Sequence, residues 1–326
     1  MSAAYYYILS LASANTNIYK IGGPILITIG TLSCVISLRV FTRKTLRRNP
    51  CSIYLIASYL SNFLMIYTSI LISTLGTGYN INPSAYDLVF CRFRYYITFI
   101  CDVLSPSYLI FAAIDRVFVT SRDALVRQRS TPRLAYRCII AITLFWLIFH
   151  IHALFFTIII IGSASSIGVC YFQPGMYLTL ISYYSMIIKA ILIPLLMIFL
   201  GLWTVNNVRA LSKVAAITTH SSLSGIGAAM GGIRSARSKD RQLIKIILVD
   251  TSIYILFNTM ISVLLVYQQV MQNQVQPYVQ LYLQGFLMSV SVFSAYIPFC
   301  IGCYTNLFVS KTFRHEVQKL LTCQQQ

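Results

Sequence analysis

Ionisable residues stand in stretches of the sequence that are otherwise apolar. Asp102, Lys189 and Asp250 each interrupt a run of aliphatic and aromatic residues, and Asp115 directly precedes Arg116 at the end of another, in "AAIDRVFV". If these runs cross a bilayer, each buried charge costs about 2.5–3.5 kcal/mol, which makes the residues candidates for a functional role. Charges in such surroundings pair with one another, bind a charged ligand, or form a switch that a conformational change breaks.

Asp102 and Lys189 leave three interpretations open. They form a structural bridge that avoids isolated buried charges, they anchor a ligand, or they do not meet. An intramembrane enzyme would need converging catalytic groups, and the nearest candidates, Asp102 and Asp250, are expected at different depths. No group of cysteines and histidines has the spacing of a metal site. We therefore expect neither catalysis nor a bound cofactor or metal.

The composition of the chain indicates a membrane protein. Of its 326 residues, 57% are hydrophobic and only 10% are charged, which is too apolar for a soluble domain of this length. Crossing about 30 Å of hydrocarbon takes about 20 helical residues, and closed barrels would show alternation instead of long apolar runs. The sequence predicts an all-α membrane protein, a seven-transmembrane helix bundle with spans at about residues 21–41, 51–75, 89–114, 137–161, 177–203, 243–267 and 279–308.

The basic residues indicate the orientation of this bundle. Of the 25 lysines and arginines, 21 fall in every second gap, at residues 39–48, 116–137, 209–245 and 311–319. Cytoplasmic loops carry such an excess, so the N-terminus is expected outside. The net charge of +18 could suggest nucleic acid, but no soluble domain with a basic face is present in the sequence. The expected partner is the lipid bilayer, with no nucleic acid.

The predicted topology divides the chain into three parts. Residues 1–20 lack the basic region of a signal peptide, and their apolar patch is too short to cross, so we expect a short extracellular tail. Residues 21–308 form the transmembrane domain, and residues 309–326 lie in the cytoplasm. Within the domain, residues 219–239 are rich in Ser, Gly and basic residues, which is typical of a flexible loop.

Two of the nine cysteines are expected on the outer side. Cys91 opens the third span, and Cys170 lies in the loop between the fourth and fifth spans, whereas the others lie in spans or on the reducing cytoplasmic side. Their compartment and isolation favour a disulfide that holds the loop over the mouth of the bundle. The alternative is two unpaired thiols.

Several of these features together carry a family resemblance. Cys91 opens the third span, the triplet Asp115-Arg116-Val117 follows at its inner end, and Cys170 lies in the next outer loop. The combination resembles the rhodopsin-like family of G-protein-coupled receptors over nearly the whole chain. Trp146 in the fourth span and Pro194 in the fifth are further matches. The resemblance implies a plasma-membrane receptor that binds an extracellular ligand and activates a heterotrimeric G protein.

The resemblance also assigns roles on the cytoplasmic side. Arg116, beside Asp115, would be the switch that contacts the G protein, held at rest by Asp240 near the start of the sixth span. Residues 311–321, "KTFRHEVQKLL", are similar to the family's short amphipathic eighth helix. Cys323 just beyond resembles a palmitoylation site, the alternative being a plain thiol.

The sequence departs from the family pattern in three spans, one of them the seventh, where Pro298 and Tyr304 stand six residues apart and no Asn-Pro-x-x-Tyr element is recognisable. Asn62 stands where the second span usually carries the Asp of a sodium site, with Ser105 as a possible partner. The sixth span, residues 250–265, has neither the Trp nor the Pro of the family's Cys-Trp-x-Pro element. Tyr254 and Phe257 are the aromatic pair expected to replace that Trp.

The ligand is the least specified feature. Amine receptors of this family carry an Asp where this chain has Thr98, and opsins carry a Lys in the seventh span, where residues 279–308 have none. Aromatic residues in "PYVQLYLQ" suit a peptide ligand. The alternative function is a polytopic transporter or channel, which would be expected to carry a polar pathway across the bilayer. The expected ligand-pocket residues are Thr98, Asp102, Lys189, Tyr254 and Phe257.

Overall fold

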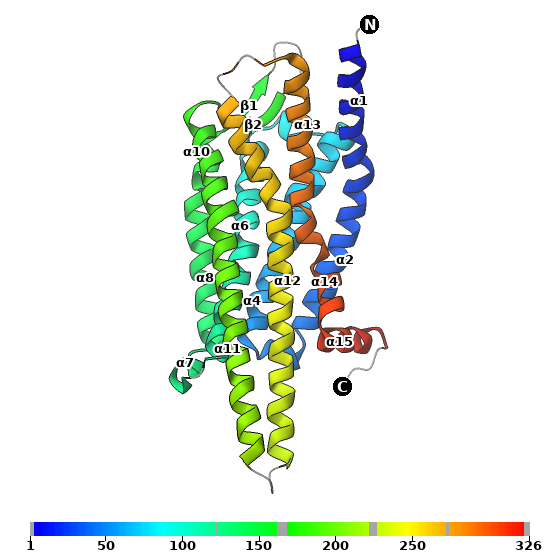
Figure 1. The fold of residues 1–326 in the computed structure, drawn as a ribbon. Coiled ribbons are helices and arrows are strands. Elements are labelled where there is room, and N and C mark those ends of the chain that lie inside the picture. Colours follow the sequence, from blue (N-terminus) through cyan, green and yellow to red (C-terminus); the bar gives the residue numbers. More distant parts are fainter. Residues whose placement is uncertain are drawn as a thin grey trace.

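The fold is a bundle of long helices with a small hairpin at one end (Figure 1). The computed structural model describes residues 3–121, 123–161, 168–221, 227–271, 274 and 276–322, and for residues 3, 45, 161, 211–221, 227–241 and 321 it describes the backbone alone. Its elements in chain order are α1 (Ala3–Asn17), η1 (Ile18–Gly22), α2 (Gly23–Phe41), α3 (Lys44–Arg47), α4 (Pro50–Met65), η2 (Ile66–Ile70), α5 (Leu71–Ser73), η3 (Thr74–Gly78), η4 (Pro83–Ala85), α6 (Leu88–Val119), α7 (Ala124–Gln128), α8 (Pro132–Phe149), η5 (His150–His152), α9 (Ala153–Phe156), β1 (Thr157–Ile161), β2 (Gly168–Phe172), α10 (Met176–Tyr184), η6 (Ser185–Leu192), α11 (Ile193–Ser221), α12 (Gly227–Met271), α13 (Tyr278–Ala295), α14 (Ile297–Val309) and α15 (Lys311–Leu321).

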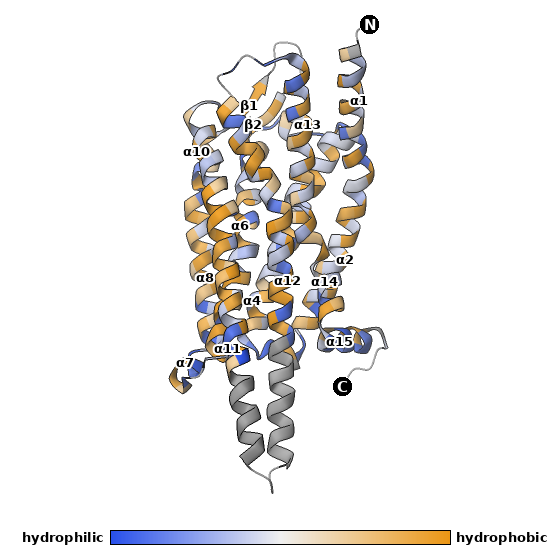
Figure 2. Cartoon of the chain, viewed as in Figure 1, coloured by the Kyte–Doolittle hydropathy of each residue, from blue (hydrophilic) through white to orange (hydrophobic). Residues whose placement is uncertain are grey.

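The described residues contain seven helical segments long and apolar enough to cross a membrane, as the sequence predicted. Apolar residues cover the outer helices along most of the bundle, and hydrophilic residues gather at its ends (Figure 2). This distribution is that of a multi-pass membrane protein. The segments are Ala4–Phe41, Pro50–Gly78, Leu88–Val119, Pro132–Phe156, Met176–Ala210, Gln242–Met271 and Tyr278–Val309.

The first helical segment is longer than expected. Residues 3–20, expected as a short extracellular tail outside the spans, are helical and run through η1 into α2 without a break. At 1.5 Å per residue, the 38 residues of Ala4–Phe41 extend about 57 Å, well beyond the hydrocarbon thickness of about 30 Å. The helix therefore extends beyond the hydrocarbon thickness, and α1 packs beside α13 at the hairpin end of the bundle (Figure 1).

A two-stranded antiparallel sheet follows the fourth span. The sequence placed residues 157–161 inside that span, and this boundary is wrong, because the span ends at Phe156 and residues 157–161 form a strand. β1 pairs with β2, with Ile159 opposite Cys170. The β1 sequence, "TIIII", is wholly β-branched, a composition that favours a strand although its hydropathy is that of a span.

The third span, α6, lies at the centre of the bundle. It packs against α4, α8, α11 and α12, and much of its length is buried. Small hydroxyl residues allow close approach to α4, where the Ser58 Oγ lies 2.9 Å from the Ser105 Oγ and the Ser61 hydroxyl donates to the Cys101 carbonyl at 3.1 Å. One continuous helix therefore connects the hairpin end of the molecule with the opposite end.

The last helix, α15, turns away from the bundle axis (Figure 1). Ser310 caps its start by accepting a hydrogen bond from the Phe313 amide at 3.1 Å. The Phe313 side chain is buried against Phe41, with ring centroids 5.5 Å apart, and Arg43 pairs with Glu316 at 2.7 Å. One face of α15 is thus held against the end of the first span.

Candidate functional site

A cavity of about 230 Å³ lies at the hairpin end of the bundle. Residues from five of the seven spans line it, together with Tyr171 and Phe172 of β2. At about 30 Å³ per water molecule, its volume equals that of about eight waters. A concave site of mixed polar and apolar lining at the mouth of a helical bundle is a typical place for a small ligand or the end of a larger one.

The hairpin is held over this cavity by a disulfide. Cys91 at the start of α6 is bonded to Cys170 in β2, with Cα atoms 5.8 Å apart, and this is the pairing favoured by the sequence. The Arg92 guanidinium adds hydrogen bonds to the carbonyls of Thr157 and Phe155, at 3.1 and 3.4 Å. Burial raises the pKa of the Tyr171 phenol, so its hydroxyl remains protonated at neutral pH and can donate a hydrogen bond.

Asp102 and Lys189 meet across the cavity wall. The Lys189 Nζ lies 2.5 Å from the Asp102 Oδ2, and the two side chains are 11% and 13% exposed. Lys189 belongs to η6, whose wider turns alter which side chains of the fifth span face the bundle. Of the three interpretations of this pair, the structure excludes the one in which the residues do not meet.

The predicted pocket residues divide between this cavity and a smaller one. Thr98, Asp102 and Lys189 line the larger cavity. Tyr254 lines a cavity of about 30 Å³ deeper in the bundle, with room for about one water. Phe257 is not among the lining residues of either cavity, as far as the described part of the chain shows.

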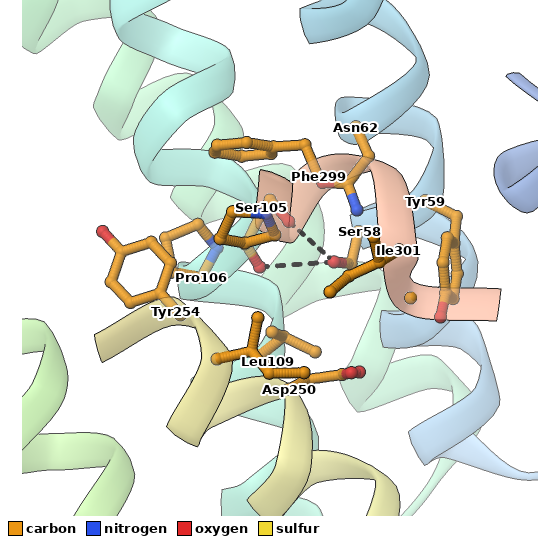
Figure 3. Close-up of a pocket in the computed structure, with 13 residues that line it drawn as sticks. Ser58, Tyr59, Asn62, Ser105, Pro106, Leu109, Asp250, Tyr254, Phe299 and Ile301 are labelled. Carbon is orange, nitrogen blue, oxygen red and sulfur yellow. Dashed lines mark hydrogen bonds between the residues drawn. The ribbon is translucent and has the colours of Figure 1, made fainter. Parts of the chain in front are cut away.

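The smaller cavity has a mixed polar and apolar lining and lies between α4, α6, α12 and α14 (Figure 3). Ser58 contacts Ser105 on one side, and Asp250 projects below Leu109 on the other. The Thr305 hydroxyl donates to the Asp250 carboxylate at 3.0 Å. Asn62 and Asp250 line this same cavity, which the sequence did not predict.

The far end of α6 carries the Asp115 and Arg116 pair. Arg116 is only 1% exposed and its guanidinium contacts both the Asp115 carboxylate and the Asn49 Oδ1, the latter at 2.8 Å. Asn49 caps α4 through the same oxygen, accepting from the Cys51 amide at 3.1 Å. The Ser130 hydroxyl donates to Asp115 at 2.5 Å. The buried guanidinium of Arg116 is thereby fixed between α6 and the start of α4, and Ser130, just before α8, holds its partner Asp115.

Two predicted residues on this side fall outside the description. The side chain of Asp240 and all of Cys323 lie outside the described residues. Three residues of these sites were not predicted from the sequence, namely Arg94, Asn49 and Tyr296. Arg94 could have been found by the rule applied to Asp102, because it is a charge within a predicted span.

Comparisons with models of known protein families and with curated proteins find no match for this sequence. What the fold defines is a class: a helical protein with seven candidate membrane spans, a disulfide-bonded hairpin over a cavity, and a buried Asp-Arg pair at the opposite end of its central helix.

Proposed function

We propose that this protein is a plasma-membrane receptor that binds an extracellular ligand, a peptide, and activates a heterotrimeric G protein. The N-terminus and the hairpin face outside, where disulfides persist, and the gaps rich in lysine and arginine face the cytoplasm. In this orientation the larger cavity opens towards the ligand. The amphipathic α15 then lies at the cytoplasmic surface as an eighth helix.

The observation that carries the proposal is the buried Arg116, which lies on α6, the helix that also lines the larger cavity. Asp102 in the cavity wall and Arg116 are 14 residues apart on α6, about 21 Å along the axis. A ligand that moves the helices around Asp102 can shift the packing at Arg116, because a buried ion pair is stable only in good geometry. Releasing the guanidinium would expose a fixed cationic fork to a cytoplasmic partner.

A peptide screen tests this proposal. Cells expressing the chain are exposed to secreted peptides, and G-protein dissociation is read out for each Gα class. We expect at least one peptide to give a signal that Arg116→Ala abolishes while surface expression is retained. Arg133→Ala is the matched control, because Arg133 is an exposed arginine on the same side, and it should signal normally. Normal signalling by Arg116→Ala, or ligand-independent ion flux in reconstituted membranes, would refute the receptor mechanism.

A further inference from the structure

The larger cavity carries an excess of positive charge. Its ionisable lining residues, tyrosines aside, are Arg94, Lys189 and Asp102. Lys189 and Asp102 neutralise each other at 2.5 Å. Among the described residues, no carboxylate lies within salt-bridge distance of Arg94. The cavity therefore presents one cation without an anionic partner.

Neutral groups hold Arg94 in place. Its guanidinium donates to the Ser73 Oγ at 2.9 Å and to the Ser84 Oγ at 3.2 Å, and it lies 5.9 Å from the centre of the Tyr95 ring. The Tyr296 hydroxyl lies 3.2 Å from the same Ser73 oxygen. These contacts fix the orientation of the guanidinium but leave its charge in place. A guanidinium has five N–H donors, so about three remain for a ligand.

The geometry of Arg94 suits a carboxylate. A guanidinium forms two parallel hydrogen bonds with a carboxylate, and such charge-assisted pairs are among the strongest in proteins. A ligand amine has no equivalent partner, because the Asp102 carboxylate is engaged by Lys189. Tyr171 also lines the cavity, and its neutral hydroxyl is a further hydrogen-bond donor for an anionic group.

The remaining walls distinguish a peptide from an acyl chain. Apolar side chains such as Leu178, Ile181, Leu265 and Met288 alternate with polar ones. Thr98, Ser182 and Asn258 are among these polar residues. An acyl chain would dehydrate such groups without replacing their hydrogen bonds, whereas peptide groups can satisfy them.

We propose that Arg94 binds the free C-terminal carboxylate of a peptide ligand whose last residues occupy this cavity. The inference rests on the proposed peptide-receptor function and adds the chemistry that the ligand must have. Arg94 lies eight residues before Asp102 on α6, about 12 Å nearer the hairpin. The carboxylate is thus held near the hairpin, and the terminal side chain extends into the rest of the cavity, towards Asp102.

The test measures direct binding to the purified full chain. The probes are N-acetylated dipeptides ending in leucine, phenylalanine or methionine, each as the free acid and as the C-terminal amide, titrated to millimolar concentrations against the thermal unfolding of the protein. At least one acid should bind at least tenfold more tightly than its amide, a difference of about 1.4 kcal/mol. Equal binding of acids and amides, or no binding by any acid, overturns the proposal.

Variants assign the preference to Arg94. Arg94→Gln should abolish the preference for acid over amide, and Arg94→Lys should restore part of it, since it keeps the charge but loses the fork. Arg92→Gln is the matched control, because Arg92 bonds hairpin carbonyls outside the cavity lining, and the acid-to-amide ratio should persist in it even if its unfolding temperature falls. An unchanged ratio in Arg94→Gln overturns the proposal.

Two further measurements separate the alternatives. Binding of a lysophosphatidate that depends on Arg94, without acid-specific peptide binding, would replace the peptide with a lipid anion. G-protein activation is measured with the same peptides in cells. Acid-specific binding without activation of any G protein would leave the Arg94 site intact and count against the proposed receptor function instead.

Discussion

The Asp102 and Lys189 pair gives the most quantitative prediction for the stability of the bundle. The side chains are 11–13% exposed and their charged atoms lie 2.5 Å apart, so removing one partner leaves the other charge buried. Breaking a buried pair in this way typically costs about 3–5 kcal/mol. Lys189→Met and Asp102→Asn should each fall in this range, whereas the double variant should lose less than the sum because no uncompensated charge remains.

The assay is a double-mutant cycle on the free energy of unfolding, measured in detergent micelles with increasing SDS. We expect a coupling energy of about 1.5–3 kcal/mol. The pair of Arg43 and Glu316, whose side chains are 24% and 12% exposed, is an internal comparison and should couple by less than about 1 kcal/mol. The double charge reversal Asp102→Lys with Lys189→Asp should recover part of the unfolding free energy that either single reversal loses. Fully additive losses of unfolding free energy in the Asp102 and Lys189 cycle, for the neutral variants and for the charge reversal, would refute the interaction.

Three other predictions concern different parts of the fold. Cys91→Ser and Cys170→Ser should lower surface expression equally and the double variant should add little, since one bond is lost in each case; free reactivity of both thiols towards an impermeant reagent on intact cells would contradict this. Gly30→Ala should lower the free energy of unfolding in SDS by about 1–3 kcal/mol, because the added Cβ would lie 2.8 Å from the Cys300 Sγ. An unchanged free energy of unfolding would show that the neighbouring side chains move to make room. Asp115→Asn should raise basal G-protein signalling, because it removes the negative charge that pairs with the Arg116 guanidinium. Dissociation sensors at matched surface expression measure this, and a basal signal equal to that of the wild type would show that the ion pair does not restrain Arg116.

The sequence predicted the spans well because burial in lipid leaves a strong one-dimensional signal. Seven apolar runs gave seven helices, although the boundaries shifted by several residues. The clearest failure was at residues 157–161, where hydropathy does not distinguish a β-branched strand from the end of a span. The helical continuation of the first span into residues 3–20 was missed, because the apolar patch was judged on its own length.

Site residues were predictable only where one residue type carried the signal. Asp102 and Lys189 were found because each is a charge within a predicted span. Cys91 and Cys170 were found because the predicted topology places them on the oxidising outer side of the membrane. The position of Tyr254 in the smaller cavity depends on the rotation of α12, which no local pattern specifies. Likewise, the role of Asn49 requires knowing that the start of α4 meets the end of α6, which is a tertiary contact.

The central claim is that Arg116 couples this bundle to a G protein, and nucleotide exchange measures that coupling most directly. The purified chain is reconstituted in lipid nanodiscs with each class of heterotrimer, and the rate of GTP analogue binding to Gα is compared with that of empty nanodiscs. The account predicts faster exchange on at least one class with the wild-type chain and with Arg133→Ala, and a rate equal to that of empty nanodiscs with Arg116→Ala. Exchange that is no faster than in empty nanodiscs for every class, or equal acceleration by Arg116→Ala, would contradict it.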